Sequence, residues 1–449
     1  MKKFMEPESV ALIGLSRKTG PGSYNIMENM IRFGYKGKIF PVNPNARSIL
    51  GKKSFSNIKE IQEPIDLAVI SAPREDTITI LNDCARADIK SVIIVNQGFA
   101  DADKKGKEIQ NTIKEIGTKH GIRILGPNTL GILNNYNNFT TSFMPLTNEK
   151  SSVGLICQSG ILFVGAEDFS GTIGKGIDLG NGCDIGFFEA LKYFQEDPDI
   201  KIIAIHMEGL YQGKEFLSLA NEVARKKPVI LLKTALTETS IKSAMSHTGN
   251  MAGNFQIHEG VMKQAGIVFL EEDGQMKYAV KTLCNMPALK GSNIAVITFS
   301  GAAGIMVTDA LEKYGLKLST LSHNTINKIA KLSPDWMPLG NPLDIWPAVM
   351  KYGAEKVYSI ALEAVLSDSQ VDGVVCISIA PLLPDFSFLD VSESLNAVMK
   401  KQLNKPVVAW LYGPNKDEIS KRFESGKKIM TYPTLETAAW SLSILKSNY

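Results

Sequence analysis

The sequence predicts an α/β protein with an N-terminal Rossmann-like domain followed by two further parallel α/β domains. At 449 residues the chain is too long for one core and suggests about three domains of ~100–200 residues each. Short apolar runs alternate with amphipathic stretches, which indicates parallel strands covered by helices on both faces of a sheet. The strand–turn–helix pattern then resumes twice. We therefore expect domains at 1–133, 152–285 and 286–449.

Five apolar runs of the first domain are predicted to be strands of one parallel sheet. Ligands of such sheets bind at the carboxyl ends of the strands. A polar, irregular segment follows at 134–152 and is predicted to be a linker. The five runs are VALIGL (10–15), KIFPVN (38–43), DLAVISAP (66–73), SVIIVN (91–96) and RILGPN (123–128).

The second and third domains share three landmarks in the same order. VGLICQSGILFVGA (153–166) resembles IAVITFSGAAGIMVTDA (294–310), and in each an apolar strand leads through a Ser-Gly turn into a helix. GNGCDI corresponds to GNPLDI, and KPVILLK to KPVVAWL. These pairs suggest two copies of one α/β unit. The alternative is that two unrelated parallel domains share the same local pattern.

Composition and charge exclude several classes of protein. The chain has 44% hydrophobic and 21% charged residues, and 49 basic against 46 acidic residues leave a net charge of +3. That balance provides no basic stripe for nucleic acid. The N-terminus lacks the apolar core of a signal peptide, and no window approaches a membrane span of ~18 apolar residues. We expect a cytoplasmic protein whose five scattered cysteines are reduced thiols.

The first turn, GLSRKTGPGS (14–23), follows a strand and precedes a helix, so its amides suit a phosphate group. It does not spell GxGxxG, and the second strand ends in VNPN (42–45) rather than in an acidic residue, which disfavours NAD. Ser16 and Arg17 suit a nucleotide that carries an extra phosphate. The alternative is that Ser16 caps a helix and Arg17 is a solvated charge.

The stretch SHTGNMAG places His247 among small residues. A neutral imidazole is nucleophilic near pH 7 because its pKa is ~6.5. The second copy continues after KPVVAWL as YGPNKDEISKRF and has no such histidine. His247 is therefore an addition to the shared framework. The alternative is a loop histidine in a plain glycine turn.

Motifs along nearly the whole chain resemble one family. GLSRKTGPGS, VNPN, LAVISAP, NQGF and ILGPNTLGIL occur in that order, followed by CQSG, GNGCD, MEG and SHTGNMAG, and then by TFSGAAG and GNPLD. This series resembles the NDP-forming acyl-CoA synthetases, which include the succinyl-CoA synthetase alpha subunit, and most of all the alpha subunits of ADP-forming acetate-CoA ligases. The resemblance implies that the second and third domains are flavodoxin-like.

The resemblance also implies roles for particular residues. His247 becomes phosphorylated, and Glu208 accepts a hydrogen bond from its ring. Without the resemblance, Glu208 is an ordinary strand-end carboxylate. For Asn181 and Asp184 the family implies a place near the acyl site, whereas turn and cap chemistry is the alternative. The phosphate would be bound by Gln158, Ser159, Gly160, Ser300 and Gly301, although FSGAAG departs from the family pattern at Ser300. CoA would be held by Gly14, Ser16, Arg17, Asn43, Pro44, Pro73, Gly98, Phe99 and Asn128.

No GxxxxGK[ST] loop occurs in the chain. The resemblance implies a partner beta subunit of the ATP-grasp type that holds ADP or ATP and Mg²⁺, so we expect a hetero-oligomer. The implied activity is that of an acid–thiol ligase acting on a small carboxylic acid, its acyl-CoA and phosphate. Two other readings remain open, a CoA-binding regulatory protein without catalysis and an NAD-dependent oxidoreductase.

Overall fold

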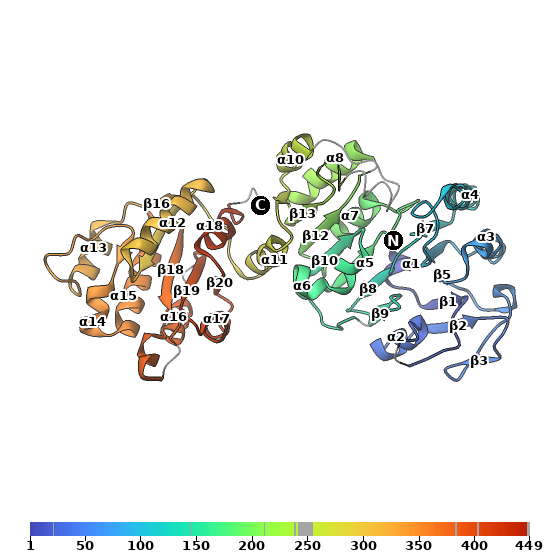
Figure 1. Cartoon of the computed structure of the whole chain (residues 1–449), viewed down its shortest axis with the longest axis horizontal. Coiled ribbons are helices and arrows are strands. Elements are labelled where there is room, and N and C mark those ends of the chain that lie inside the picture. The colour runs from blue at the N-terminus through green and yellow to red at the C-terminus, as the bar shows by residue number, and fades with distance from the viewer. Residues whose placement is uncertain are drawn as a thin grey trace. The chain divides into compact units, whose positions relative to one another are not determined.

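The computed structural model describes residues 1–20, 22–144, 146–210, 212–237, 239–240, 255–381, 384–401 and 404–446. The chain divides into two compact units, residues 1–280 (unit 1) and 281–449 (unit 2). Figure 1 shows the two main sheets of unit 1 and the sheet of unit 2. Each unit is described by itself below.

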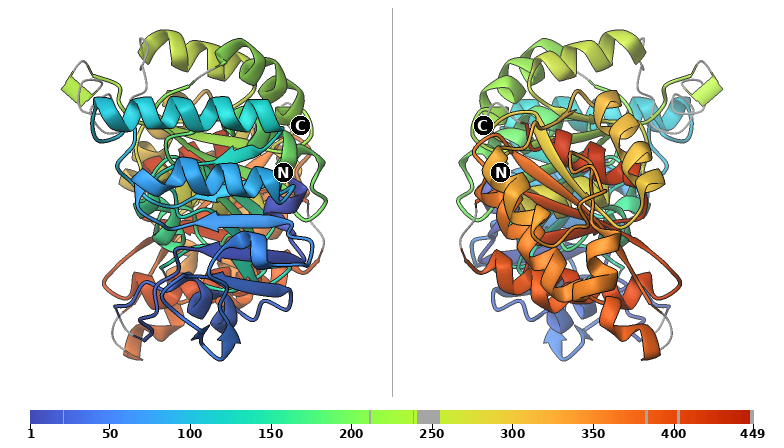
Figure 2. Two further views of the ribbon diagram at one scale, coloured as in Figure 1. Left: turned by 90° about the vertical axis from the view of Figure 1, so that its right-hand side faces the viewer. Right: turned by 90° about the vertical axis from the view of Figure 1, so that its left-hand side faces the viewer.

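The first sheet of unit 1 is parallel, with the strand order β2-β1-β5-β6-β7. All five predicted strands of this domain are present. Helices α3 and α4 lie side by side on one face, as Figure 2 shows. The bounds are α1 Lys2–Met5, β1 Ser9–Ile13, α2 Ile26–Phe33, β2 Lys38–Val42, β3 Ser48–Ile49, β4 Lys52–Lys53, β5 Leu67–Ile70, α3 Thr77–Arg86, β6 Ser91–Ile94, α4 Lys104–His120 and β7 Arg123–Leu125.

The second sheet of unit 1 has the order β14-β13-β12-β10-β11-β8-β9. Its strands β10 to β14 are parallel, and the β8–β9 hairpin adds to them antiparallel at β11. The bounds are β8 Ile132–Asn134, β9 Phe139–Thr140, β10 Val153–Cys157, α5 Gly160–Val164, α6 Ala166–Ser170, β11 Lys175–Asp178, α7 Phe187–Glu196, β12 Ile202–Met207, α8 Gly213–Ala224, β13 Val229–Lys233, α10 Phe255–Gln264, β14 Val268–Leu270 and α11 Gln275–Asn285.

The segment 134–152 is therefore not simply a linker. Its first residues complete β8 and β9, which form the edge of the second sheet. Asn134 is fully buried and donates from Nδ2 to the Met5 carbonyl at 3.0 Å. The polar side chains that suggested a loop satisfy backbone groups inside unit 1. One cluster of buried apolar side chains also continues from the first sheet into the second, for example from Leu12 to Ile156.

Unit 2 contains a parallel sheet of order β16-β15-β18-β19-β20, with β17 also paired to β15. Helices α12 and α18 contact each other, as do α13, α14 and α16 with α15. The bounds are β15 Asn293–Thr298, α12 Gly301–Lys313, β16 Lys317–Leu318, α13 His323–Ala330, β17 Leu343–Asp344, α14 Trp346–Tyr352, α15 Ala354–Ser367, β18 Gly373–Ile379, α16 Ser392–Met399, β19 Val407–Tyr412, α17 Lys416–Glu424, β20 Ile429–Tyr432 and α18 Leu435–Ser443.

The sheet of unit 2 has the same strand order as β10 to β14, which supports two copies of one unit. β15, β18, β19 and β20 take the places of β10, β12, β13 and β14, while β16 and β17 together replace β11. One predicted landmark is wrong. Asp178 pairs with Cys157 in the first copy as Asp344 pairs with Thr298 in the second, so Asp344 is the counterpart of Asp178 and not of Asp184. GNGCDI follows its strand, whereas GNPLDI runs into one.

Candidate functional site

The carboxyl edge of the first sheet gathers the residues that the sequence assigned to CoA. They come from the ends of five different strands, which parallel pairing brings to one edge. Gly14, Ser16 and Arg17 follow β1, Asn43 and Pro44 follow β2, Pro73 follows β5, Gly98 and Phe99 follow β6, and Asn128 follows β7.

The turn between β1 and α2 is fixed from within by Asn25, which the sequence analysis missed. Asn25 Nδ2 donates to the carbonyls of Ser16 at 2.8 Å and Lys18 at 3.0 Å, and its side-chain oxygen caps α2. Ser16 and Arg17 are exposed on this turn. The side chains suited to phosphate therefore lie on a pre-formed loop. An asparagine directly before a helical pattern was the available signal.

Gly14 lies where the direction of strand order reverses, between β1 and β5. It has φ +79°, and a Cβ atom there would lie 2.6 Å from the Ala72 nitrogen, so only glycine fits. Asn43 Nδ2 donates to the Leu15 carbonyl at 2.8 Å and ties the end of β2 to the same place. Crevices of this kind are where nucleotides bind in open α/β sheets.

The loops after β6 and β7 are held by side chains from both sheets of unit 1. Arg74 donates to the Gly98 carbonyl at 2.5 Å, and Asp101 accepts from the amides of Gly98 and Phe99 at 3.0 Å. The Phe99 ring is fully buried in the core of the first domain, so only its backbone faces this edge. Asn128 has φ +59°, and its Nδ2 lies 3.4 Å from Oδ1 of Asn181.

The carboxyl edge of the second sheet joins the predicted phosphate turn to the predicted catalytic carboxylate. Gln158 Oε1 accepts from the amides of Glu208 at 2.8 Å and Gly209 at 3.1 Å. Ser159 and Gly160 begin α5, which is only five residues long. Gln158 is buried and Glu208 is half-buried.

Asp178 is a second buried carboxylate at this edge, and the sequence analysis missed it. Its Oδ2 accepts from the Leu130 amide at 2.7 Å, and Oδ1 accepts from the Gly180 amide at 3.3 Å. Burial raises the Asp178 pKa to about 6, against the effect of these amides, and the nearby Glu208 charge adds to the rise. The strand KGID has one apolar side chain, Ile177, so the sequence carried little signal for a buried carboxylate at its end.

A cavity of 390 Å³ lies in unit 1 between α4 and the loops of the second sheet. Gln158, Gly209 and Gln212 line the side next to Glu208, and Asn181 lies between them and α4. Asn181 Nδ2 donates to Asp101 at 2.7 Å and to Gln110 at 3.0 Å. The remaining lining includes Lys107, Gln110, Asn111 and Lys114 of α4 and Leu179, Cys183, Phe187 and Phe188.

Asp184 lines the same cavity, but its carboxylate hydrogen-bonds to strand β7. Oδ2 accepts from Arg123 Nε at 2.9 Å and from the Ile124 amide at 2.7 Å. It therefore joins the loop after β11 to strand β7. These are long-range structural contacts, which neither the acyl-site role nor local turn and cap chemistry predicted.

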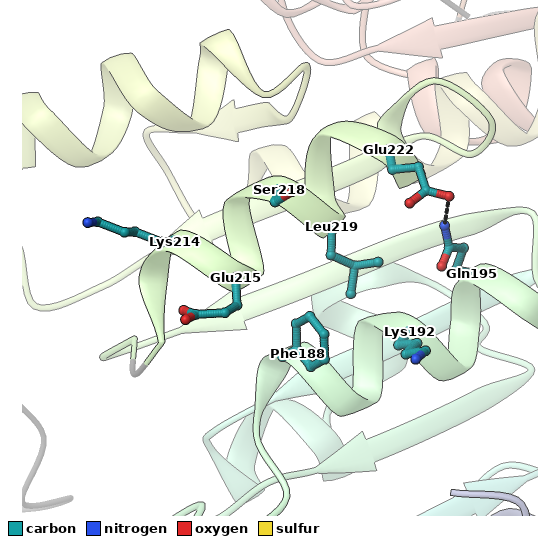
Figure 3. Close-up of a pocket in the computed structure, with 8 residues that line it drawn as sticks. All are labelled: Phe188, Lys192, Gln195, Lys214, Glu215, Ser218, Leu219 and Glu222. Carbon is teal, nitrogen blue, oxygen red and sulfur yellow. Dashed lines mark hydrogen bonds between the residues drawn. The ribbon is translucent and has the colours of Figure 1, made fainter.

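A different hollow lies on the outer surface of unit 1 between α7 and α8. Figure 3 shows Phe188 and Leu219 facing each other there, with Gln195 donating to Glu222 at 2.8 Å. None of its lining residues was assigned a role from the sequence. It shares only Phe188 with the 390 Å³ cavity.

Ser300 and Gly301 begin α12 in unit 2. The Ser300 hydroxyl caps this helix by accepting from the Ala303 amide at 3.5 Å, and Asp344 Oδ2 would lie 3.7 Å from a Cβ atom at Gly301. His247 lies outside the described residues. So does the rest of 241–254, which follows β13 and the turn after it.

Comparisons with known proteins match three successive parts of the chain to family models. Residues 8–135 match a CoA binding domain, residues 150–283 match the succinyl-CoA ligase like flavodoxin domain, and residues 294–449 match a Ligase-CoA domain. The fold and the matched domains define a CoA-binding chain of the acyl-CoA ligase class.

The chain belongs to the family of ADP-forming acetate–CoA ligases. It is 31% identical to acetate–CoA ligase [ADP-forming] II subunit alpha of Pyrococcus furiosus, over 97% of this chain and 95% of that subunit. It is 36% identical to acetate–CoA ligase [ADP-forming] II of Archaeoglobus fulgidus, where the match covers 91% of this chain but only 60% of the relative. The chain therefore spans an alpha subunit and about three fifths of a longer relative.

A solved structure has the same fold. The dinucleotide forming acetyl-coenzyme A synthetase 1 of Ca. Korarchaeum cryptofilum, in complex with phosphate and ADP, matches with a TM-score of 0.88 and 28% identity over 99% of this chain and 96% of that one. Among the described residues of the present chain, no helix has the length and apolar character needed to cross a membrane.

Proposed function

We propose that this chain is the alpha subunit of an NDP-forming acyl-CoA synthetase and acts in the cytoplasm with an ATP-grasp beta subunit. The hydrogen bond from the Glu208 amide to Gln158 carries the proposal, because it joins the predicted phosphate turn to the predicted catalytic carboxylate. The 390 Å³ cavity beside this bond reaches α4 of the CoA-binding domain.

The first-sheet residues fit CoA. Arg17 and the amides of the β1–α2 turn are donors for its phosphates, while Gly14, packed against Ala72, and Asn43 fix the turn beside the crevice between β1 and β5. Pro44, Pro73, Gly98, Phe99 and Asn128 form the rest of that edge. The acyl end lies toward Asn181, and Asp184 keeps the loop in place.

The reaction runs in three balanced steps. A phosphate oxygen attacks the thioester carbonyl, and the CoA thiolate leaves, which gives acyl phosphate. A ring nitrogen of His247 then attacks phosphorus and the carboxylate leaves, while Glu208 accepts a hydrogen bond from the other ring nitrogen. The phosphoryl group finally passes to ADP on the partner, where Mg²⁺ offsets its charge.

Backbone amides stabilise the phosphoryl group before that transfer. Gln158, Ser159 and Gly160 offer such donors in the second domain. In the third domain Gly301 offers one, while the Ser300 amide donates to Thr298 Oγ1 at 3.0 Å. The assembled enzyme is a hetero-oligomer that interconverts acyl-CoA, ADP and phosphate with carboxylic acid, CoA and ATP.

The test uses the chain alone, incubated with phosphate and a panel of acyl-CoAs. Intact mass then reports one added phosphoryl group, which is stable to base and labile to acid. Loss of this group in His247→Asn supports phosphoryl transfer through His247. The extent of wild-type labelling with each acyl-CoA ranks the acyl substrates. Phosphorylation that persists in His247→Asn contradicts it. Tight CoA binding without any phosphorylation, also when the partner is present, favours the CoA-binding regulatory protein.

A further inference from the structure

The strand ends next to Glu208 differ from their counterparts in the second copy. In unit 2 the ladder between β18 and β19 closes, because the Ala380 amide donates to the Tyr412 carbonyl at 2.8 Å. In unit 1 the equivalent amide, that of Gly209, donates instead to the Gln158 side chain. The equivalent carbonyl, that of Thr234, accepts from the side chain of Lys233.

Lys233 is the last residue of β13 and is only 3% exposed. Its ammonium donates to the Glu208 carbonyl at 2.6 Å and to the Thr234 carbonyl. Thr234 is also held through its amide, which donates to the Met207 carbonyl at 3.0 Å, and through Oγ1, which lies 3.1 Å from Nε2 of His206. Thr234 is therefore bound at two points to the strand that leads into Glu208, and the Lys233 ammonium links its carbonyl to that of Glu208.

The second copy shows that the sheet does not need these groups. By strand register, Ile377 replaces His206, Ile379 replaces Glu208 and Leu411 replaces Lys233. Leu411 is buried at 4% exposure. A buried ammonium costs free energy that a leucine does not, so the lysine in the first copy is better explained by function than by packing.

We propose that Lys233 is a positioning residue of the phosphoryl-transfer site, holding the ends of β12 and β13 apart so that Glu208 and Thr234, the first residue of the segment after β13, keep a fixed mutual position. The inference rests on the proposed function, because that segment leads to His247. Gln158 acts with Lys233 by accepting from the Gly209 amide, which the open ladder leaves without a strand partner, and from the adjacent Glu208 amide.

The test compares Lys233→Leu, which introduces the residue of the second copy, with Lys233→Arg and with Lys175→Met. Lys175 is the matched control because it is equally buried and pairs with Asp197 at 2.6 Å. It is the first residue of β11 and so lies at the amino ends of the strands of the same sheet. We expect Lys233→Leu to lower the rate of phosphoryl incorporation about 10- to 100-fold with CoA affinity unchanged. We expect Lys175→Met to lower thermal stability and to keep the rate below its melting temperature. A Lys233→Leu rate within about twofold of wild type overturns the proposal, as does an equal loss of rate in Lys175→Met.

The pH profile separates positioning from packing. Burial lowers the Lys233 pKa to about 8, opposed by the Glu208 charge. Burial, and to a smaller extent the Lys233 charge, lowers the pKa of His206 to about 4, so His206 stays neutral across this range. The wild-type rate should fall as pH rises through about 8, and Lys233→Arg, which stays protonated, should restore the rate and lose this fall. Identical profiles for wild type and Lys233→Arg overturn the proposal, including where Lys233→Leu does not fold.

Amide hydrogen exchange tests the same contact without turnover. Faster exchange at Glu208 and Thr234 in Lys233→Leu, with unchanged exchange in the middle of β10, supports the proposal. Unchanged exchange at both amides overturns it. A wild-type chain that takes no phosphoryl group while Lys233→Leu shows faster exchange contradicts the proposed function and leaves the positioning role standing.

Discussion

Two fully enclosed lysines of the second sheet lie at opposite edges and are bound differently. Lys175 begins β11, and its ammonium pairs with Asp197 at 2.6 Å and Asp199 at 2.9 Å. Burial lowers its pKa, but the two carboxylates outweigh burial and the net pKa is raised. Lys233 ends β13 and donates to two carbonyl groups, so burial prevails and its pKa falls to about 8.

The difference indicates different roles for the carboxyl and amino ends of the strands, which are called here the carboxyl edge and the amino edge of the sheet. At the amino edge the charge is neutralised, which is the arrangement expected where only stability is at stake. At the carboxyl edge Lys233, Asp178 and His206 all have shifted pKa values, and such clusters occur at functional sites. Changes at the carboxyl edge should affect chemistry, whether or not they also affect stability, and changes at the amino edge should affect stability alone.

Glu208→Gln should have the largest effect and tests the carboxyl edge directly. The amide keeps the shape of the side chain but orients the histidine ring poorly, so we expect phosphoryl incorporation to fall about 100- to 10,000-fold. The rate of labelling with acyl-CoA and phosphate measures this. Glu215→Gln on α8 is the control and should keep the wild-type rate. Equal rates for the two variants would remove Glu208 from the chemistry.

Asp197→Ala tests the amino edge. It leaves Lys175 buried with only Asp199, which is 38% exposed, and should lower the free energy of unfolding by about 3 kcal/mol. Urea denaturation measures the change, and phosphoryl transfer should stay normal below the transition. Lys226→Ala, which breaks an exposed pair with Glu222, should cost less than about 0.5 kcal/mol. A loss of activity in folded Asp197→Ala would contradict the separation of the two edges.

His206→Ile tests the carboxyl edge through pH. Burial lowers the native His206 pKa to about 4 from 6.5, so between these values the unfolded chain binds a proton that the native chain does not. Wild-type stability should therefore rise with pH across this window, by at most about 3 kcal/mol. His206→Ile introduces the residue of the second copy and should flatten that rise. Urea denaturation at pH 4.5 and pH 7 measures the change in the free energy of unfolding between the two pH values. An equal change in wild type and His206→Ile would show that His206 does not titrate on unfolding.

Arg17→Ala should have the smallest effect and extends the comparison to the first sheet. Arg17 is exposed, so losing its bonds to phosphate should weaken CoA binding about 3- to 10-fold without changing the melting temperature. Calorimetric titration with CoA measures the affinity. Arg86→Ala on α3, which breaks a pair with Asp83 at 2.9 Å, should leave CoA affinity unchanged. Unchanged affinity in Arg17→Ala would place the CoA phosphates elsewhere.

Much of the fold was accessible from the sequence because apolar periodicity is local. All five strands of the first domain, the two Ser-Gly turns and the end of β12 before Glu208 follow from runs of apolar residues and the turn residues after them. The hairpin β8–β9 was missed because its polar residues, such as Asn134, are satisfied by backbone groups distant in sequence.

The sequence by itself determined the order of strands and turns, the candidate residues at the strand ends and the duplication of one α/β unit. Only the tertiary structure decided which strands are neighbours, and with that the counterpart of Asp344, the role of Asn25 and the contacts of Lys233. The physical reason is that a strand pattern reports burial but not register. Whether a buried lysine contacts two carboxylates or two carbonyl groups depends on segments of the chain that come together only in the folded sheet.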